Sequence, residues 1–284
     1  MAETLLEIRG LRISLPTPNG AVEVVRDASI EVKQGEIVGL AGESGSGKTM
    51  TSSAVLGLLP PSAQTGGEIM FGGRDLLQLS AEEMNRVRGR EISMVFQDPG
   101  SSLHPLLRIG TQITEHLRYH LGLSRAAANA RAVELLHQVR IPNPKTALSA
   151  YPHQFSGGQR QRAAIAIALA CDPKLIIADE PTTALDVTVQ AGVLRLFDRL
   201  SREMGLSILF ITHDLGVLSS VTDRSYIFRN GAVVESGVTA DVLNRPQQEY
   251  TRSLIEARFQ SLAERVDRAE PADVGDLSEN GAAQ

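Results

Sequence analysis

Residues 42–49 read Gly-Glu-Ser-Gly-Ser-Gly-Lys-Thr and fit the phosphate-loop pattern G-x-x-x-x-G-K-[ST] at every fixed position. A short apolar stretch precedes the loop, and a stretch typical of a helix start follows it. The glycines let the backbone curl so that successive N–H groups face a polyphosphate, and the helix adds its positive end. The alternative is a Gly- and Ser-rich turn that binds nothing. We predict a nucleotide-binding loop made of Gly42, Glu43, Ser44, Gly45, Ser46, Gly47, Lys48 and Thr49.

Two adjacent carboxylates, Asp179 and Glu180, follow a predicted buried strand at residues 174–179. In a parallel sheet, ligands collect at the carboxyl edge of the strands, so this pair should face the same crevice as the phosphate loop. Asp179 would then hold Mg²⁺, and Glu180 would accept a proton from an attacking water. The alternative is a solvated Asp-Glu turn before Pro181.

Gln97 and His213 also end apolar stretches, at residues 92–96 and 208–212. A lone histidine after a strand is usually a surface residue. Here, however, both positions repeat that of Asp179 and of the phosphate loop. If the strands are parallel, all four features surround one site.

A second anion-binding helix start is predicted at residues 156–159, which read Ser-Gly-Gly-Gln. Ser156 followed by Gln159 is a capping-box pattern, and two glycines leave the backbone N–H groups of the first turn accessible. The simplest use of two such sites is a head-to-tail dimer, in which each nucleotide lies between the phosphate loop of one copy and Ser156, Gly157, Gly158 and Gln159 of the other. The alternative is an ordinary capped helix.

The elements that must position these residues alternate between strands and helices, which favours an α/β domain around a parallel sheet. Residues 5–40 alternate apolar and polar positions and predict short antiparallel strands at 6–9, 22–25 and 29–32, interrupted at residues 16–20. Further strands are expected at 91–97, 174–179 and 207–212. A hairpin at 232–237 and one or two short helices should follow. Residues 104–155, with a long helix over 125–139, predict an inserted helical lobe that extends to about residue 170.

Composition limits the classes of function. The 284 residues carry a net charge of −5, so no global basic field attracts nucleic acid, and no nucleic-acid partner is expected. Cys171 is the single cysteine and is expected to be a core residue. No signal peptide is recognisable, and the longest apolar run, residues 163–171, is too short to span a bilayer. Residues 262–284 are expected to form a disordered tail, leaving residues 1–261 as one nucleotide-binding domain.

Taken in order, these motifs resemble those of the ATP-binding cassette (ABC) ATPases. The resemblance covers about residues 5–240 and implies the fold of a phosphate-loop NTPase of ABC type, with an antiparallel β subdomain and an inserted α-helical subdomain. It implies ATP and Mg²⁺ as ligands. It also implies catalytic roles for Gln97, Glu180 and His213, Mg²⁺ ligation by Thr49, Gln97 and Asp179, and nucleotide contact from Asp186 in the segment at residues 184–186.

A finer resemblance is to the ATPase subunits of dipeptide, oligopeptide and nickel importers. It rests on residues 97–105, 151–154, 180–190 and 244–252. It implies a peripheral protein at the cytoplasmic face of the cell membrane. The implied partners are a second ABC ATPase subunit, two integral membrane permease subunits and an extracytoplasmic substrate-binding protein. Rival readings are an exporter subunit and a soluble ABC ATPase that acts on nucleic acid or ribosomes.

The chain departs from that group in three respects. A single cysteine excludes the cysteine-ligated iron–sulfur cluster that many members carry. No aromatic residue precedes Phe71, so adenine is expected to rest on Val24 or Arg26. Gly100 and His104 stand where methionine and asparagine are expected. Separately, His116 and His120 are spaced to bind a metal on a helix, although no further ligand is evident and surface histidines are the preferred interpretation.

Overall fold

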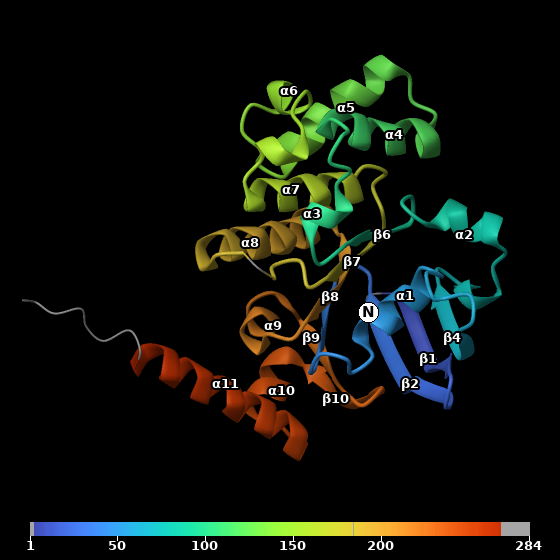
Figure 1. Ribbon diagram of the computed structural model, residues 1–284, viewed down its shortest axis with the longest axis vertical. Coiled ribbons are helices and arrows are strands. Elements are labelled where there is room, and N and C mark those ends of the chain that lie inside the picture. The colour runs from blue at the N-terminus through green and yellow to red at the C-terminus, as the bar shows by residue number, and fades with distance from the viewer. Residues whose placement is uncertain (1–2, 184, 268–284) are drawn as a thin grey trace, which may run out of the picture.

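The computed structural model describes residues 3–183 and 185–267, and within these residues ten strands form one sheet (Figure 1). Their order is β5-β4-β1-β2-β10-β9-β3-β8-β7-β6. One half of the sheet is antiparallel and the other is mostly parallel, as the sequence predicts. The parallel half carries the polar strand ends that concern function.

The antiparallel half is a long hairpin extended by two further strands. Its strands are β1 (Thr4–Thr17), β2 (Gly20–Lys33), β4 (Gln64–Phe71) and β5 (Arg74–Asp75). The separate short strands predicted at 22–25 and 29–32 are therefore two parts of β2. Bulges between Ile8 and Ser14 bend the hairpin, which explains why the alternation in the sequence breaks up.

The parallel strands are β3 (Ile37–Ala41), β8 (Ser207–Thr212), β7 (Leu175–Asp179) and β6 (Ile92–Val95). Every residue of β3, β7 and β8 is buried, as expected for strands that are covered on both faces. Each strand is followed at its carboxyl end by one of the predicted polar features. Helices that pack around these strands include α1 (Lys48–Val55), α8 (Val187–Met204) and α9 (Leu215–Val221).

The hairpin predicted at residues 232–237 is wrong. Residues 232–238 form one strand, β10 (Ala232–Val238), whose partner β9 (Arg224–Arg229) lies before the turn at Asn230 and Gly231. Only residues 226–228 of β9 form an apolar run, which is too short to signal a strand. β9 also pairs in parallel with β3, and β10 meets β2 at one residue pair, so these two strands join the halves of the sheet.

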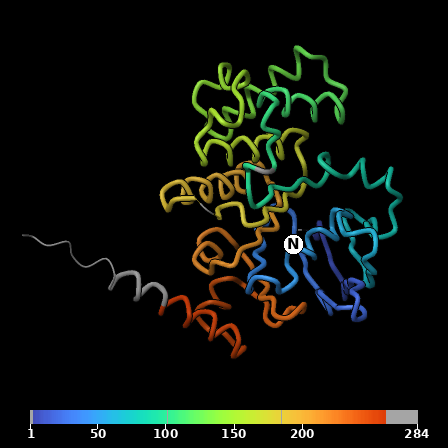
Figure 2. The backbone as a smooth tube through the Cα atoms, viewed as in Figure 1, coloured from blue at the N-terminus to red at the C-terminus, as the bar shows by residue number. Residues whose placement is uncertain are grey.

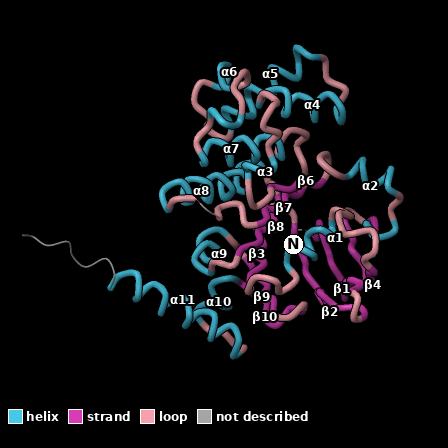
Figure 3. Tube along the Cα trace, viewed as in Figure 1, coloured by secondary structure: helices cyan, strands magenta, loops and turns pink. Residues whose placement is uncertain are grey.

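A layer of helices lies beyond β6 and β7 and is inserted between them in the chain, as Figures 2 and 3 show. It consists of α3 (Pro99–Ser102), α4 (Ile109–Leu121), α5 (Arg125–Gln138), α6 (Pro144–Ala147) and α7 (Gly157–Ala168). The helix predicted over 125–139 corresponds to α5. Buried apolar residues of α4, α5 and α7 share one core with β7 and α8, so the lobe is attached firmly to the parallel sheet.

The remaining α-helices are α2 (Ala81–Val87), α10 (Thr239–Asn244) and α11 (Glu249–Asp267), and two short 3₁₀ helices span Leu76–Gln78 and Pro152–Gln154. Helix α11 is longer than the short helices predicted here, and it continues past residue 262, where the tail was expected to begin. Residues 268–284 lie outside the described residues. In Figure 1, α11 lies beside α10 and extends away from the sheet.

Candidate nucleotide-binding site

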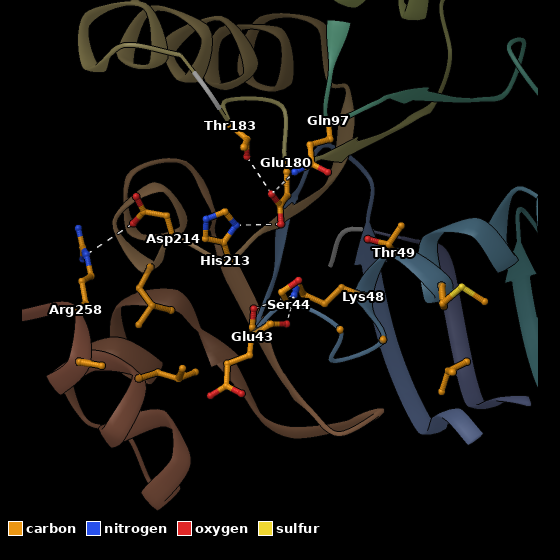
Figure 4. A pocket seen from close by; sticks show the side chains of 18 residues that line it. Glu43, Ser44, Lys48, Thr49, Gln97, Glu180, Thr183, His213, Asp214 and Arg258 are labelled. Carbon is orange, nitrogen blue, oxygen red and sulfur yellow. Dashed lines mark hydrogen bonds and ion pairs between the residues drawn. The ribbon is translucent and has the colours of Figure 1, made fainter. Parts of the chain in front are cut away.

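The carboxyl ends of the parallel strands open into a cleft of about 1010 Å³. Residues from the phosphate loop, from the segment after β6, from the turn after β7 and from the end of β8 line it together (Figure 4). The predicted residues in its lining are Gly42, Glu43, Ser44, Gly45, Gly47, Lys48, Thr49, Gln97, Glu180 and His213. The four predicted features therefore lie together at the carboxyl ends of the parallel strands.

The phosphate loop requires glycine at two positions for different reasons. Gly47 adopts a left-handed φ of 110° and is the N-cap residue of α1. Gly42 also has a positive φ, and a Cβ built there would lie 2.2 Å from the carbonyl oxygen of Phe228. No side chain caps α1, so the N–H groups of its first turn remain available to an anion in the cleft.

Lys48 is almost fully buried beneath the loop, at 4% exposure. Its Nζ donates hydrogen bonds to the carbonyl oxygens of Gly42 and Glu43, both at 2.8 Å, and to Oγ of Ser46 at 3.3 Å. Burial lowers the pKa of Lys48, and the nearby carboxylates of Glu180, Asp179 and Glu43 act in the opposite direction. The loop thus surrounds its own cation and holds it through loop oxygens.

Three polar side chains converge on the Glu180 carboxylate from three different segments (Figure 4). Oε2 accepts hydrogen bonds from Nε2 of Gln97 and from Oγ1 of Thr183, both at 3.0 Å. Oε1 lies 3.0 Å from Nδ1 of His213. Glu180 also has a φ of 46°, a conformation that is uncommon for a residue with a side chain. The turn after β7 therefore directs this carboxylate into the cleft.

Asp179, the last residue of β7, lies deeper than Glu180 and is 7% exposed. Burial raises the pKa of Asp179, whereas a hydrogen bond with Thr49 and the charge of Lys48 act to lower it. Its Oδ1 is buried without a hydrogen-bond partner. A buried carboxylate oxygen without a partner, beside a threonine hydroxyl, is the donor set that Mg²⁺ prefers in nucleotide sites.

The second predicted anion site is a well-formed helix start that lies elsewhere. Oγ of Ser156 accepts a hydrogen bond from the N–H of Gln159, and the Ser156 N–H donates to Oε1 of Gln159. A Cβ at Gly158 would fall 2.5 Å from Cγ1 of Val189, so glycine at this position also allows α8 to pack closely against the start of α7. Asp186 caps α8 through the N–H of Val189.

Among the described residues that line the cleft, none comes from 156–159 or is Asp186. Ala184, in the same predicted segment as Asp186, lies outside the described residues. The structure therefore brings together the phosphate loop, Gln97, Glu180 and His213, and it leaves the second anion site apart from them within one chain.

Part of the cleft is formed by residues that the sequence did not reveal. Helix α11 contributes Leu254, Ala257 and Arg258, and Nε of Arg258 lies 3.7 Å from Oδ1 of Asp214. Their spacing resembles that of any helix face, so no sequence signal distinguished them. Of the two residues expected beneath adenine, Val24 lines the cleft and Arg26 does not.

The two histidines of α4 stack on each other with ring centroids 6.1 Å apart, and both are partly buried rather than fully at the surface. Burial lowers the pKa of each imidazole. Across residues 3–183 and 185–267, no group of three or more His, Cys, Asp or Glu side chains is arranged to hold a metal ion. Cys171 is buried, as predicted. None of the described helices is long and apolar enough to cross a membrane.

Comparison with known proteins decides the family. The model of the family described as ABC transporter matches residues 25–183, which is more than half of the chain and includes the phosphate loop, Gln97 and the Glu180 turn. The chain belongs to the ABC transporter family. It is accordingly an ATPase that binds ATP, and the fold described above is that of an ABC nucleotide-binding domain.

The similar curated proteins are consistent in kind. The oligopeptide transport ATP-binding protein OppD of Bacillus subtilis is 49% identical over 253 residues, which cover 88% of this chain and 71% of OppD. The dipeptide transport ATP-binding protein DppD of the same organism is 46% identical, covering 89% of this chain and 76% of DppD. Among solved structures, the dimeric, post-hydrolysis state of the ATP-binding cassette MJ0796 bound to ADP and Pi matches this ABC ATPase with a TM-score of 0.74 and 27% identity, covering 83% of this chain and 99% of that one.

Proposed function

We propose that this ABC ATPase is the ATP-hydrolysing subunit of an importer for peptides or a related small solute, at the cytoplasmic face of the cell membrane. The observation that carries the proposal is its identity of 46–49% to OppD and DppD over nearly nine-tenths of the chain. The cleft supports it, because Lys48, Gln97, Glu180 and His213 converge there. The cargo itself would be chosen by other subunits.

In this proposal Glu180 orients the attacking water and accepts its proton. Lys48 exchanges its contacts with loop carbonyl oxygens for contacts with the β- and γ-phosphates, while the free N–H groups at the start of α1 hold the same anion. His213, now 3.0 Å from Glu180, would turn toward the γ-phosphate and stabilise the charge that develops there. Val24 would support adenine through apolar contact.

Mg²⁺ would be held by Asp179, Thr49 and Gln97. The unpaired, buried Oδ1 of Asp179 and the neighbouring hydroxyl of Thr49 fit this ion. When bound, Mg²⁺ neutralises charge on the β- and γ-phosphate oxygens. Gln97 has its amide near the Glu180 carboxylate and can turn its oxygen toward the ion.

A second ATPase subunit would complete the site. Each ATP would be held between the phosphate loop of one subunit and Ser156, Gly157, Gly158 and Gln159 of the other, with Asp186 close to the shared interface. ATP binding would close this pair, and hydrolysis would reopen it. The proposal is supported by the separation of the two anion sites within one chain and by the dimeric state of the similar cassette MJ0796.

Two integral membrane permease subunits and an extracytoplasmic substrate-binding protein would be the remaining partners. A groove of about 270 Å³ lies between β6 and the helical lobe, and it is lined mainly by apolar side chains. At its rim Leu58 and Phe96 are 48% and 46% exposed. Because Phe96 directly precedes Gln97, an apolar segment of a permease in this groove would communicate with the cleft.

The substitution Glu180→Gln tests the assignment of the ATPase site. It should leave ATP binding intact and slow hydrolysis at least ~100-fold, because an amide cannot accept the proton. Hydrolysis near the wild-type rate would remove Glu180 from its role. A matched control is Glu256→Gln on the exposed face of α11, which should change neither quantity.

Co-purification from detergent separates the importer from its rivals. The proposal predicts recovery of two integral membrane proteins and an extracytoplasmic binding protein. Recovery of DNA or ribosomes without membrane subunits would favour a soluble ABC ATPase. A membrane subunit that transports solute outward in proteoliposomes would favour an exporter.

A further inference from the structure

The turn after β7 holds two adjacent threonines that contact different partners. Oγ1 of Thr183 donates a 3.0 Å hydrogen bond to Oε2 of Glu180 and lines the cleft. Oγ1 of Thr182, which is buried, instead accepts a 3.4 Å hydrogen bond from Nε2 of Gln190. Only the second threonine therefore touches the proposed catalytic carboxylate (Figure 4).

The three side chains that contact Glu180 belong to different parts of the chain. Gln97 lies between β6 and the helical lobe, and His213 lies at the end of β8, so both contacts join separate segments. Thr183 lies on the same turn as Glu180, and its own N–H donates to the Glu180 carbonyl oxygen at 3.2 Å. The Thr183 contact is local, and it does not depend on the placement of the lobe or of β8.

The proposed function requires two of these three side chains to leave Glu180 for another partner. Gln97 must turn toward the metal, and His213 must turn toward the γ-phosphate. Oε2 of Glu180 already accepts two hydrogen bonds, whereas Oε1 has one contact, with Nδ1 of His213, and keeps lone-pair capacity for a proton. If His213 leaves Oε1 while Thr183 keeps Oε2, then Oε1 becomes free and the carboxylate keeps its orientation.

We propose that Thr183 is a positioning residue for ATP hydrolysis, which holds Oε2 of Glu180 so that Oε1 faces the attacking water. This inference rests on the proposed role of Glu180. The positive φ of Glu180 fits this role, because a sparsely populated backbone conformation persists only where surrounding contacts hold it, and both Thr183 hydrogen bonds are among those contacts. Thr183 touches neither nucleotide nor water in this account, and it acts only through the carboxylate.

The test compares Thr183→Val, Thr183→Ser and Thr182→Val in the full-length chain. Removing the hydroxyl with Thr183→Val should lower kcat on the order of 10-fold, since a hydrogen bond to a charged group is lost. KM for ATP should not change, because no nucleotide contact is altered. Thr183→Ser keeps the hydroxyl and should restore kcat. Thr182→Val makes the same chemical change one residue away and should leave kcat within about 2-fold.

A double-mutant cycle with Glu180→Gln shows whether Thr183 acts through the carboxylate. In the Glu180→Gln background, Thr183→Val should have no further effect on the residual rate. Should Thr183→Val fail to fold in a thermal melt, Thr183→Ala makes the same comparison with a smaller side chain. An unchanged kcat in either variant, or an equal loss in the Glu180→Gln background, would overturn the positioning role. Wild-type protein without ATPase activity would instead overturn the proposed function.

Discussion

Helix α1 begins at Gly47 with no side chain capping its first turn, whereas α7 begins behind Ser156, whose hydroxyl accepts the N–H of Gln159. The first helix start opens directly into the cleft with Lys48 beneath it. The second contributes nothing to that cleft among the residues that the structure describes. Both starts carry glycines and both present backbone N–H groups.

The two helix starts therefore differ in what they can bind within a single chain. The phosphate loop has N–H groups that no side chain caps and a cation beneath them. The Ser156 helix start is already stable through its capping box, although the Ser156 hydroxyl proton and the Gly157 and Gly158 N–H groups remain free to donate. One chain therefore presents an uncapped helix start in its cleft and a capped helix start outside the lining of that cleft, as the proposal of a shared site requires.

The largest expected effect comes from removing the cation of the first site. Lys48→Ala should lower ATP binding and hydrolysis together, with hydrolysis reduced ~10²–10³-fold, because a donor to the transferring phosphoryl group is lost. The measurement is fluorescent-nucleotide binding beside phosphate release. Lys145→Ala, at an exposed site in α6, is the control and should leave both unchanged. Normal nucleotide affinity in Lys48→Ala would contradict the role of the loop.

A change at the second helix start should separate the two quantities and lower hydrolysis without lowering nucleotide binding. Ser156→Arg places a bulky cation at the helix start and should reduce hydrolysis roughly 100-fold, because the partner subunit can no longer close over the γ-phosphate. Nucleotide binding to the isolated chain should remain at the wild-type level, since Ser156 does not line its own cleft. A parallel loss of binding would show that the two sites act within one chain.

The capping boxes at Ser80 and Ser156 allow a matched comparison of smaller effects on unfolding free energy and on kcat. Ser80 and Glu83 cap α2 with the same reciprocal hydrogen bonds as Ser156 and Gln159 in α7. Each Ser→Ala substitution should cost about 1 kcal/mol of unfolding free energy, measured with denaturant. Only Ser156→Ala should also lower kcat. Equal kcat values in the two variants would reduce Ser156 to an ordinary cap.

The buried carboxylate of Asp179 should lower the unfolding free energy of the protein when no ligand is bound. Burial raises the pKa of Asp179, so the unfolded chain ionises first as pH rises, and the wild type loses stability until the folded carboxyl ionises too. Asp179→Asn should therefore raise the unfolding free energy on the order of 1 kcal/mol at pH 7, and the gain should vanish toward pH 3. Thermal melts against pH measure it. Asp198→Asn, at a surface ion pair, is the control.

The sequence predicted well which polar side chains the fold brings to one cleft, because the signals for their positions are local. Glycine spacing identified the phosphate loop, and polar residues at the ends of apolar runs identified Gln97, Glu180 and His213. The parallel arrangement of β3, β6, β7 and β8 then follows from the alternation of strands and helices. The prediction that these residues line one cleft needed no further information.

The remainder depends on contacts between distant segments. Strand β9 was missed because its apolar run is short. Its extended conformation is held by pairing with β3, which is distant in the sequence, and with β10, which comes later in the chain. Arg258 reaches the cleft only because α11 packs beside α9, near Asp214. Thr183 differs from Thr182 only in the direction in which the turn points its hydroxyl. Neither side-chain type nor spacing carries that information.

A crosslinking experiment between two copies tests the shared site most directly. One chain would carry Glu43→Cys and the other His153→Cys, both in a Cys171→Ser, Glu180→Gln background that binds ATP without turnover. With ATP, a short bis-maleimide should join the two chains, because in the proposed dimer the segment before Ser156 would lie over the partner's phosphate loop. With ADP, the yield should fall. No crosslink in ATP, in samples that sediment as dimers, would contradict a nucleotide shared between the two helix starts.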